Sequence, residues 1–510
     1  MKRKYFYFVE ENMKKSIALI LVILQVLCVL VACDSGKKPA DTSDPTVTTA
    51  PGEQGGSEAV DTSKLSEAER RALVDDELPD DKDFGGRDFI IVTLDIRKDL
   101  YVTEDQTGMA LNDVIYDRNN TMNADYGVNI SAISYPDRHA CRGAIQQAMT
   151  SGDTEMFDLV SYHLVDNAAT AIAGLYRNWY EVPYVDFEKP WWSDSNIEEL
   201  TVNGKAYMAL GDLNLGTITT IYSYLLNKKM AADAGLEDLY QLVRDGKWTI
   251  DKVEEICARL YNDVNADGVK DTGDIYGLST SKGSPFVAYQ WAFDVPIVKK
   301  DETGTPQFSV NTEKYPDMLV KMVELYNNGT GVWANLSNSK DHIQIFNNGQ
   351  ALLRTGGFGN LPTLVGEVDF EIGVLPYPKW DEEQKEYYSQ VGGSAESMGI
   401  SIVESDEETA IIGLITEALC AESYKQVIPV YYDMMLKNRY ADMPDDAEMM
   451  DILVEGRVYD LGYIYDNWKG AGFWMQNLVN ANNTAVASHY ASNWPAAEKY
   501  YNTVLNLFAN

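Results

Sequence analysis

The sequence predicts an α/β protein built from two lobes. Behind an N-terminal region of different composition, about 425 residues remain, which is more than one ordinary hydrophobic core organises. The apolar run Phe89–Val92 suits a buried strand. Helical spacing then runs from Met109 to Tyr126 and ends at Gly127, and a second strand begins at Val128. Strand, helix and strand in this order indicate a crossover between parallel strands, which is nearly always right-handed.

More elements of both kinds are expected further along the chain. Strands are expected at Phe157–Val160, Ala206–Leu210 and Ile221–Leu226. Helices are expected at Thr249–Leu260, Pro316–Tyr326 and Glu407–Ala421. The sequence shows no internal repeat, so an array of repeats is not indicated.

The first residues have the three parts of an export signal: a basic start, an apolar run from Ile17 to Val31, and small residues before a cysteine. Met13, followed by two lysines, is an alternative start. Leu30–Cys33 resembles the lipobox that signal peptidase II cleaves, which implies that Cys33 carries a lipid and holds the protein on the outer face of a cell membrane. An uncleaved transmembrane helix is the alternative, although the run is shorter than the ~20 residues usually needed.

Residues 33–84 are expected to form a disordered linker behind the signal peptide at 1–32. This stretch is rich in Asp, Ser, Thr, Pro, Gly and Glu and has few large apolar residues. Such a composition cannot bury enough surface to offset the loss of chain entropy on folding. The linker would therefore act as a stalk.

Charge and cysteine content exclude several function classes. Removing residues 1–32 takes away five basic and two acidic residues and changes the net charge from −36 to −39. Nucleic acid is then a poor partner, because phosphate binding needs a basic face. Cys141, Cys257 and Cys420 remain in the mature chain without a CxxC or Cys/His pattern, so no metal or redox site of that kind is indicated. At least one of the three is expected to be a small buried apolar residue.

Short motifs occur in a specific order along most of the chain. They include Tyr224–Met230, Ala234–Leu236 and Gly246–Asp251. Others are Lys189–Trp192, Asn203–Tyr207, Phe346–Ala351, Gly373–Lys379 and Tyr387–Ser389. Each motif is weak alone, but in this order they resemble the family 1 extracellular solute-binding proteins, which include the maltose-binding type.

This resemblance implies the type II periplasmic-binding-protein fold, with two lobes, each a mixed sheet flanked by helices, and a ligand cleft that closes by a hinge. By analogy the chain first crosses near Thr217–Tyr224, returns to lobe one near Phe346 and leaves it near Ser401. The expected lobes are therefore 85–218 with 346–401, and 219–345 with 402–510.

The resemblance also implies a function: a monomeric, lipid-anchored binding protein of an ABC importer that captures a carbohydrate, expected to be an oligosaccharide, and delivers it to permease subunits. A secreted glycoside hydrolase is an alternative, because paired carboxylates cannot be excluded by count. The sequence has no HExxH, GxSxG or P-loop motif, and the resemblance itself argues against an enzyme. A sensor subunit of the same fold, which presents its ligand to a membrane kinase, is a second alternative.

Candidate ligand-binding residues are those that follow expected strands, because open α/β sheets bind ligands beyond the carboxyl ends of their strands. Tyr162 and His163 follow one strand, and Asp212 and Asn214 follow another. Tyr222 lies on the expected hinge strand. Helix caps, turns and core packing are the competing interpretations for all five.

Four further candidates come from the resemblance. Phe358 takes the place of the Trp that relatives carry in a Gly-Pro-Trp segment, and Glu396 lies in a glycine-rich segment before an apolar strand. Trp291 and Trp474 fall where relatives often present stacking rings. Other aromatics, including Trp191, Trp192 and Trp248, belong to motifs that recur whatever the ligand and are expected to be structural.

The segment from Asp263 to Asp274 has the spacing of a calcium loop. Its expected ligands are Asp263, Asn265, Asp267, the Val269 carbonyl, Asp271 and Asp274, with Gly268 at the sharp turn. Two features depart from an EF-hand: Asp274 replaces the bidentate Glu, and Lys270 occupies an apolar position. The segment that follows is expected to be a strand. A single structural calcium site is therefore predicted, with an acidic surface loop as the alternative.

Overall fold

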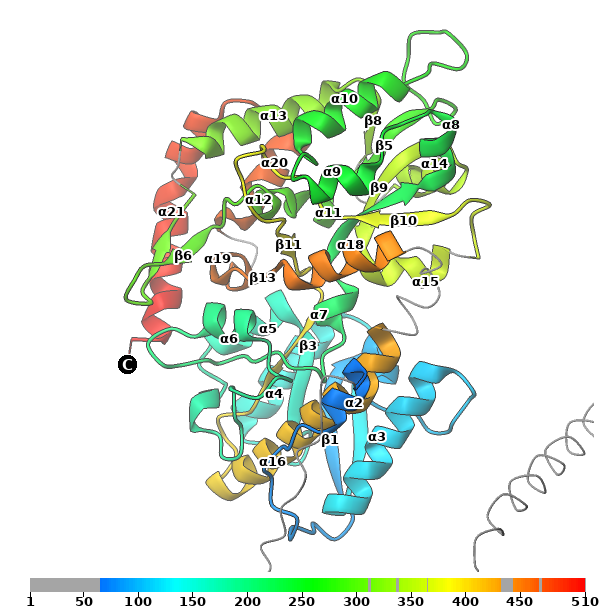
Figure 1. Ribbon diagram of the computed structural model, residues 1–510. Coiled ribbons are helices and arrows are strands. Elements are labelled where there is room, and N and C mark those ends of the chain that lie inside the picture. Colours follow the sequence, from blue (N-terminus) through cyan, green and yellow to red (C-terminus); the bar gives the residue numbers. More distant parts are fainter. Residues whose placement is uncertain are drawn as a thin grey trace, which may run out of the picture. The chain divides into compact units, whose positions relative to one another are not determined.

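The computed structural model describes residues 65–310, 313–335, 339–364, 366–432, 444–466 and 470–509, and these form two lobes, each around its own sheet (Figure 1). The predicted signal peptide, the lipidation site at Cys33 and the linker as far as residue 64 lie outside the described residues. Within the described ranges, no helix is long and apolar enough to cross a membrane.

Lobe one contains a four-stranded sheet in the order β12-β3-β1-β2. Strands β1 (Arg87–Leu94), β2 (Val128–Tyr135) and β3 (Leu159–His163) are parallel, and β12 (Glu396–Gly399) adds to β3 in the antiparallel sense. Between β1 and β2 lies α3 (Ala110–Tyr126), which ends at Gly127 with a φ of 60°. The strand, helix and strand expected here are confirmed. The other principal helices of this lobe are α4 (Arg138–Ser151), α5 (Leu164–Ile172) and α16 (Asp406–Glu422).

Lobe two contains a five-stranded sheet in the order β10-β4-β9-β5-β8. Its strands are β4 (Tyr222–Asn227), β5 (Tyr276–Ser281), β8 (Val332–Asn335), β9 (Ala351–Gly357) and β10 (Ile372–Leu375). Strand β5 is parallel to β8 and β9, whereas β4 is antiparallel to β9 and β10. The helices of this lobe are α8 (Lys228–Asp233), α9 (Leu239–Arg244), α10 (Ile250–Leu260), α13 (Lys314–Asn328), α14 (Asp341–Asn347), α18 (Pro444–Glu455), α20 (Trp474–Asn480) and α21 (Val486–Leu507). The mixed sheets and the expected helices at 249–260, 316–326 and 407–421 are confirmed.

Shorter elements complete the two lobes. They are α2 (Glu67–Ala72), η2 (Asp95–Leu100), η3 (Trp179–Glu181), α6 (Asp194–Leu200), α7 (Gly216–Thr219), α11 (Ser284–Val287), α12 (Tyr289–Ala292), β6 (Val298–Lys300), β7 (Pro306–Phe308), η4 (Phe358–Asn360), α15 (Leu361–Leu364), β11 (Ser389–Gln390), the π-helix η5 (Ser423–Val427), β13 (Arg457–Val458), α19 (Leu461–Ile464) and η7 (Ala471–Phe473). The expected strand at 206–210 is not formed as a full strand: the segment makes a single bridge, from Ala209 to Met398 of β12.

The predicted lobe boundaries are wrong for residues 346–391 and 402–428. Strands β9 and β10 pair with β4, so they complete the sheet of lobe two and do not return to lobe one. The chain returns to lobe one only at 391–395, the second crossing, which leads directly into β12 and its pairing with β3. Helix α16 then stays on lobe one, as the ion pair between Arg87 and Glu408 (2.9 Å) shows. The first crossing, between Asp212 and Tyr222, lies where it was expected.

The predicted disorder of residues 65–84 is also wrong. Helix α2 begins with a capping box, in which Ser66 and Glu69 bond to each other's backbone amides. Beyond it, Val74, Leu78 and Phe84 pack against the core of lobe one. Ion pairs to lobe one at 3.0–3.1 Å add to this packing, from Lys425 to Asp76 and from Lys189 to Glu77. A few well-spaced apolar residues are therefore enough to fix a segment whose average composition is polar.

The core of lobe one contains a buried carboxylate that connects helix α16 to the segment with Trp191 and Trp192. Glu417 of α16 is fully buried and accepts hydrogen bonds from the indole N–H groups of Trp191 (2.7 Å) and Trp192 (2.9 Å). These tryptophans are structural, as expected. Trp248 is likewise buried, with its N–H on the Pro376 carbonyl at 2.9 Å. All three cysteines that were expected to remain are free and buried, which confirms that expectation too.

Replacing Glu417 by Gln tests the importance of this buried acceptor. The amide nitrogen of Gln would face one indole N–H, which would then lack its partner, and an unpaired buried donor costs about 1–3 kcal/mol. We therefore expect Glu417→Gln to lower the free energy of unfolding by about that amount in urea denaturation. The exposed neighbour Glu407→Gln, on the same helix, is the control and should change it by less than ~0.5 kcal/mol. Equal stability of the two variants would contradict this assignment.

Candidate ligand-binding cleft

A cavity of about 360 Å³ lies at the crossing segments between the two lobes. Lobe one contributes Ile96, Arg97 and Leu100 from η2, directly behind β1. Lobe two contributes Gly357, the last residue of β9, and Gly359 and Asn360, which follow directly after it. Both walls are thus carboxyl ends of parallel strands, where α/β sheets bind ligands.

The remaining wall of this cavity comes from the crossing segments themselves. Thr219, Thr220 and Tyr222 come from the first crossing, and Ser394 from the second. Tyr431 follows η5 and completes the wall. The cavity therefore offers hydroxyl groups, aromatic rings and one guanidinium group within a space lined by both lobes.

Arg97 is held in place by Glu396. The Arg97 Nε forms an ion pair with the Glu396 carboxylate, and its Nη2 donates to the Ser394 carbonyl at 3.4 Å. Glu396 itself is 1% exposed, and burial raises the pKa of its carboxyl while Arg97 opposes that shift. The carboxylate lies so close to Gly216 of α7 that a Cβ there would stand 1.9 Å from Glu396 Oε2, so any larger residue at this position would have to displace the carboxylate. Glu396 thus connects a residue of the cavity to the first crossing.

A second charged cluster surrounds the carboxyl end of β3. Asp166 is fully buried and lies 3.1 Å from His163 Nδ1, 3.3 Å from Arg138 and 3.1 Å from Arg142. Burial lowers the pKa of His163 to about 4, although the Asp166 carboxylate acts in the opposite direction. The His163 side chain accepts the Asp166 amide and so caps the start of α5, directly after β3.

The structure places the nine predicted ligand residues in different environments. Tyr222 lines the cavity, and Asp212 lines a second cavity described below. Glu396 and His163 stand behind the cavity wall, the first of them in contact with Arg97. Neither of these two cavities is lined by Tyr162, Asn214, Trp291, Phe358 or Trp474, all of which are buried.

Hydrogen bonds explain two of these core positions. Asn214 Nδ2 donates to Ser161 Oγ at 2.8 Å, and Trp291 Nε1 donates to Asp460 at 2.6 Å. Phe358 turns into the core while its neighbours Gly357 and Gly359 line the cavity. Sequence reasoning missed Arg97 and Asn360, although Arg97 follows a predicted strand and the same rule would have found it.

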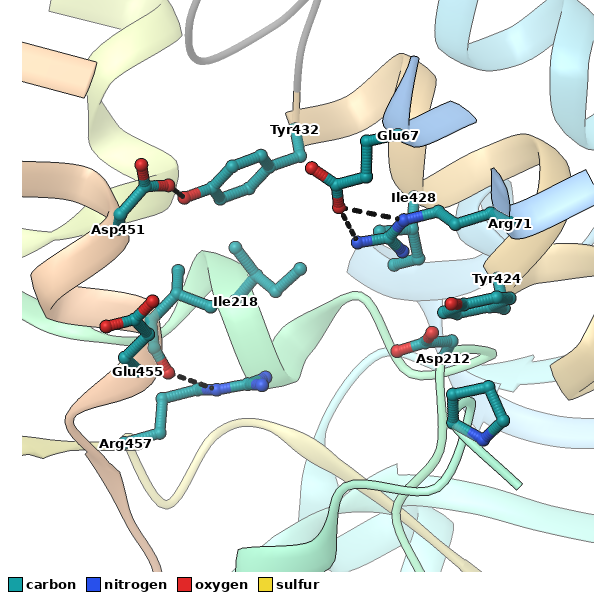
Figure 2. Close-up of a pocket in the computed structure, with 12 residues that line it drawn as sticks. Glu67, Arg71, Asp212, Ile218, Tyr424, Ile428, Tyr432, Asp451, Glu455 and Arg457 are labelled. Carbon is teal, nitrogen blue, oxygen red and sulfur yellow. Dashed lines mark hydrogen bonds and ion pairs between the residues drawn. The ribbon is translucent and has the colours of Figure 1, made fainter. Parts of the chain in front are cut away.

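The second cavity, also of about 360 Å³, lies on the other side of the crossing segments (Figure 2). Ile218 and Tyr432 line the second cavity, whereas their neighbours in the sequence, Thr219 and Tyr431, line the first. The segments 218–219 and 431–432 therefore separate the two cavities. Burial raises the pKa of Asp212 to about 7 here, and Arg71 and Arg457 oppose the shift.

The predicted calcium loop joins α10 to β5, and the strand expected behind it is confirmed. Gly268 has a φ of 78°, as the sharp turn requires. Asp263 accepts the Gly268 amide at 2.8 Å, and Asp274 accepts the amides of Val264 (3.1 Å) and Asp271 (3.2 Å). In the part of the chain that the structure describes, no group of three or more His, Cys, Asp or Glu residues is arranged to hold a metal ion. Calcium binding thus stays a prediction.

Comparison with solved structures shows which class of protein has this fold. An ABC substrate-binding protein from Listeria monocytogenes in complex with cycloalternan matches 82% of this chain and 99% of its own, with a TM-score of 0.51 at 14% identity. The maltose/maltodextrin-binding domain MalE from Bdellovibrio bacteriovorus bound to maltotriose matches 83% and 100%, with a TM-score of 0.50 at 14% identity. UspC of M. tuberculosis matches 81% and 100%, with a TM-score of 0.52 at 13% identity.

The chain therefore has the two-lobed periplasmic-binding-protein fold of the ABC substrate-binding proteins, and the predicted fold class is confirmed. The resemblance found in the sequence holds at the level of the fold. No family model matches the sequence, and no curated protein matches it either.

Proposed function

We propose that this protein is the carbohydrate-binding component of an ABC importer and that the cavity behind β1 and β9 is its ligand site. The observation that carries the proposal is the position of this cavity, at the carboxyl ends of strands from both sheets and against the segments that join the lobes. Two proteins of the same fold hold sugars in their solved structures, one cycloalternan and the other maltotriose.

The groups that line the cavity suit a sugar. Arg97 is already fixed by Glu396, so little side-chain entropy is lost when its remaining N–H groups donate to ligand hydroxyls. The Thr219 hydroxyl can donate or accept, and the Thr220 hydroxyl, which donates to the Gly216 carbonyl at 2.8 Å, can accept. The ring of Tyr222 offers an apolar face to the C–H side of a sugar. Ile96 is 78% exposed at the wall of lobe one, and closure of the lobes on a ligand would bury it.

The finer parts of the proposal rest on the sequence. Lipidation of Cys33 would anchor the protein on the outer face of a cell membrane, and the residues as far as 64 would connect the anchor to α2. A monomer held there would pass its ligand to permease subunits, with an oligosaccharide as the expected cargo. Turnover of an oligosaccharide by the purified protein would instead favour the glycoside hydrolase alternative.

A calorimetric titration with maltose, maltotriose, maltotetraose and cycloalternan tests the sugar site. We expect at least one of these to bind and to raise the melting temperature. Arg97→Gln should weaken binding about 10- to 100-fold, because a hydrogen bond from a charged donor contributes about 1.5–3 kcal/mol. Lys98→Gln makes the same charge change one residue away from the cavity wall and is the control.

Three outcomes would contradict this proposal in different ways. If none of the four sugars binds, the carbohydrate assignment fails. If a sugar binds equally well to Arg97→Gln and to the parent protein, the sugar occupies another site. If Lys98→Gln weakens binding as much as Arg97→Gln does, the effect is one of overall charge and not of contact.

We also propose that the loop from Asp263 to Asp274 binds calcium when its carboxylates turn from backbone amides to the ion. Millimolar CaCl₂ should then raise the melting temperature relative to EDTA, because an ion that binds the folded state stabilises it. The double variant Asp263→Asn with Asp267→Asn should abolish the difference, whereas the exposed Glu302→Gln should keep it. Equal melting temperatures of the parent protein in CaCl₂ and EDTA would refute calcium binding.

A further inference from the structure

The second cavity is built from both lobes and from the N-terminal helix α2. Figure 2 shows Glu67 and Arg71 of α2, Tyr424 of η5 and Tyr432 shortly after it, and Asp451 and Arg457 of lobe two around one space. Asp212 enters the same space from lobe one, just before the first crossing. Nothing in the proposed sugar site uses these residues.

Most of the charged groups in this cavity already have partners. Glu67 Oε1 accepts from Arg71 Nε at 3.0 Å and from Arg71 Nη2 at 2.6 Å. The Arg71 guanidinium also lies 4.6 Å from the centre of the Tyr424 ring. Tyr432 donates its hydroxyl hydrogen to Asp451. Glu455 is exposed at the edge, where water can solvate it.

Asp212 and Arg457 remain. Arg457 Nε donates to the Val454 carbonyl at 2.9 Å, and no partner for its two terminal amino groups is found among the described residues. The described part of the chain likewise supplies no hydrogen bond or ion pair to the Asp212 carboxylate. Figure 2 shows the two groups pointing into the cavity from facing walls, without a bond between them.

These two opposite charges restrict the chemistry of a ligand. A neutral solute would displace water from both groups and bring no opposite charge to either of them, which is costly. A simple anion would pair with Arg457 alone, and a simple cation with Asp212 alone. The Arg71 guanidinium also occupies one face of the Tyr424 ring, so this ring offers less surface on which a sugar could stack. A zwitterion compensates both charges at once.

We propose that this cavity is a second binding site and that its ligand is a small zwitterion of the α-amino acid type. The ligand carboxylate pairs with the two terminal amino groups of Arg457, a geometry that suits bidentate hydrogen bonding. The ligand ammonium donates to Asp212. Ile218, Ile428 and Val454 provide the apolar surface that the ligand side chain contacts.

The cavity has room for such a molecule beside ordered water, since ligand pockets of small molecules begin near about 300 Å³. The two anchoring groups come from different lobes, Asp212 from lobe one and Arg457 from β13 of lobe two. A bound zwitterion would therefore bridge the lobes next to the segments on which they turn.

The test is a thermal-shift screen followed by calorimetry on the purified chain, with glycine, L-serine, L-leucine, L-glutamine, L-glutamate and L-lysine as probes. We expect at least one to raise the melting temperature and to bind. Its N-acetyl derivative, which lacks the ammonium, and its C-terminal amide, which lacks the carboxylate, should each bind at least ten-fold more weakly. A derivative that binds as well as the free amino acid would overturn the pairing of both charges.

Variants locate the site. Asp212→Asn and Arg457→Gln should each weaken binding at least ten-fold, and Arg457→Lys, which keeps the charge without the planar fork, should have an intermediate effect. The control is the exposed pair on α8, Lys229→Gln and Asp233→Asn, which should leave affinity unchanged. If Arg457→Gln fails to fold, the isosteric Asp212→Asn and the derivative series decide. The proposal is refuted if no probe binds, or if binding survives both Asp212→Asn and Arg457→Lys unchanged.

Discussion

The pairing of β12 with β3 is the constraint on which both cavities depend. It brings the chain back to lobe one after the whole sheet of lobe two has been built, and so creates the second crossing, at 391–395. The register sets Glu396 opposite His163, at the carboxyl end of β3. Glu396 then reaches Arg97 on one side and Gly216 of the first crossing on the other. A single antiparallel pairing therefore fixes the crossing segments and the guanidinium group of the cleft together.

The crossing segments divide the space between the lobes into two cavities of different chemistry. One has hydroxyls, rings and an arginine that its own glutamate neutralises, which suits a neutral polyhydroxy ligand. The other has an unpaired carboxylate and an unpaired guanidinium among the described residues, which suits separated charges. Because neighbouring residues such as Ile218 and Thr219 face different cavities, a movement of the lobes that tightens one cavity must reshape the other. A ligand of the second cavity that binds the open and closed arrangements of the lobes with different affinities would then change the affinity of the first, and the coupling would be reciprocal.

The sequence predicted the fold well because its signals are local. Apolar runs and a helix ended by Gly127 identify β1, α3 and β2 without knowledge of the rest of the chain. Lobe membership is set by strand pairing between distant residues, so β9 and β10 were placed in the wrong lobe. Likewise, average composition hid the few apolar residues, such as Val74 and Phe84, that hold residues 65–84 on lobe one. The sequence carries no sign of which way aromatic residues such as Trp291 face, whereas Arg97 lies directly after a predicted strand, which is the position where α/β sheets bind ligands.

A ligand in the cavity behind β1 and β9 would draw the two lobes together. Small-angle X-ray scattering measures this closure, with a sugar for which binding has been measured added at saturation. We expect a smaller radius of gyration with the sugar than without it, and no change when the same sugar concentration is added to an Arg97 variant for which no binding is measured. Binding of the sugar with an unchanged radius of gyration would contradict it.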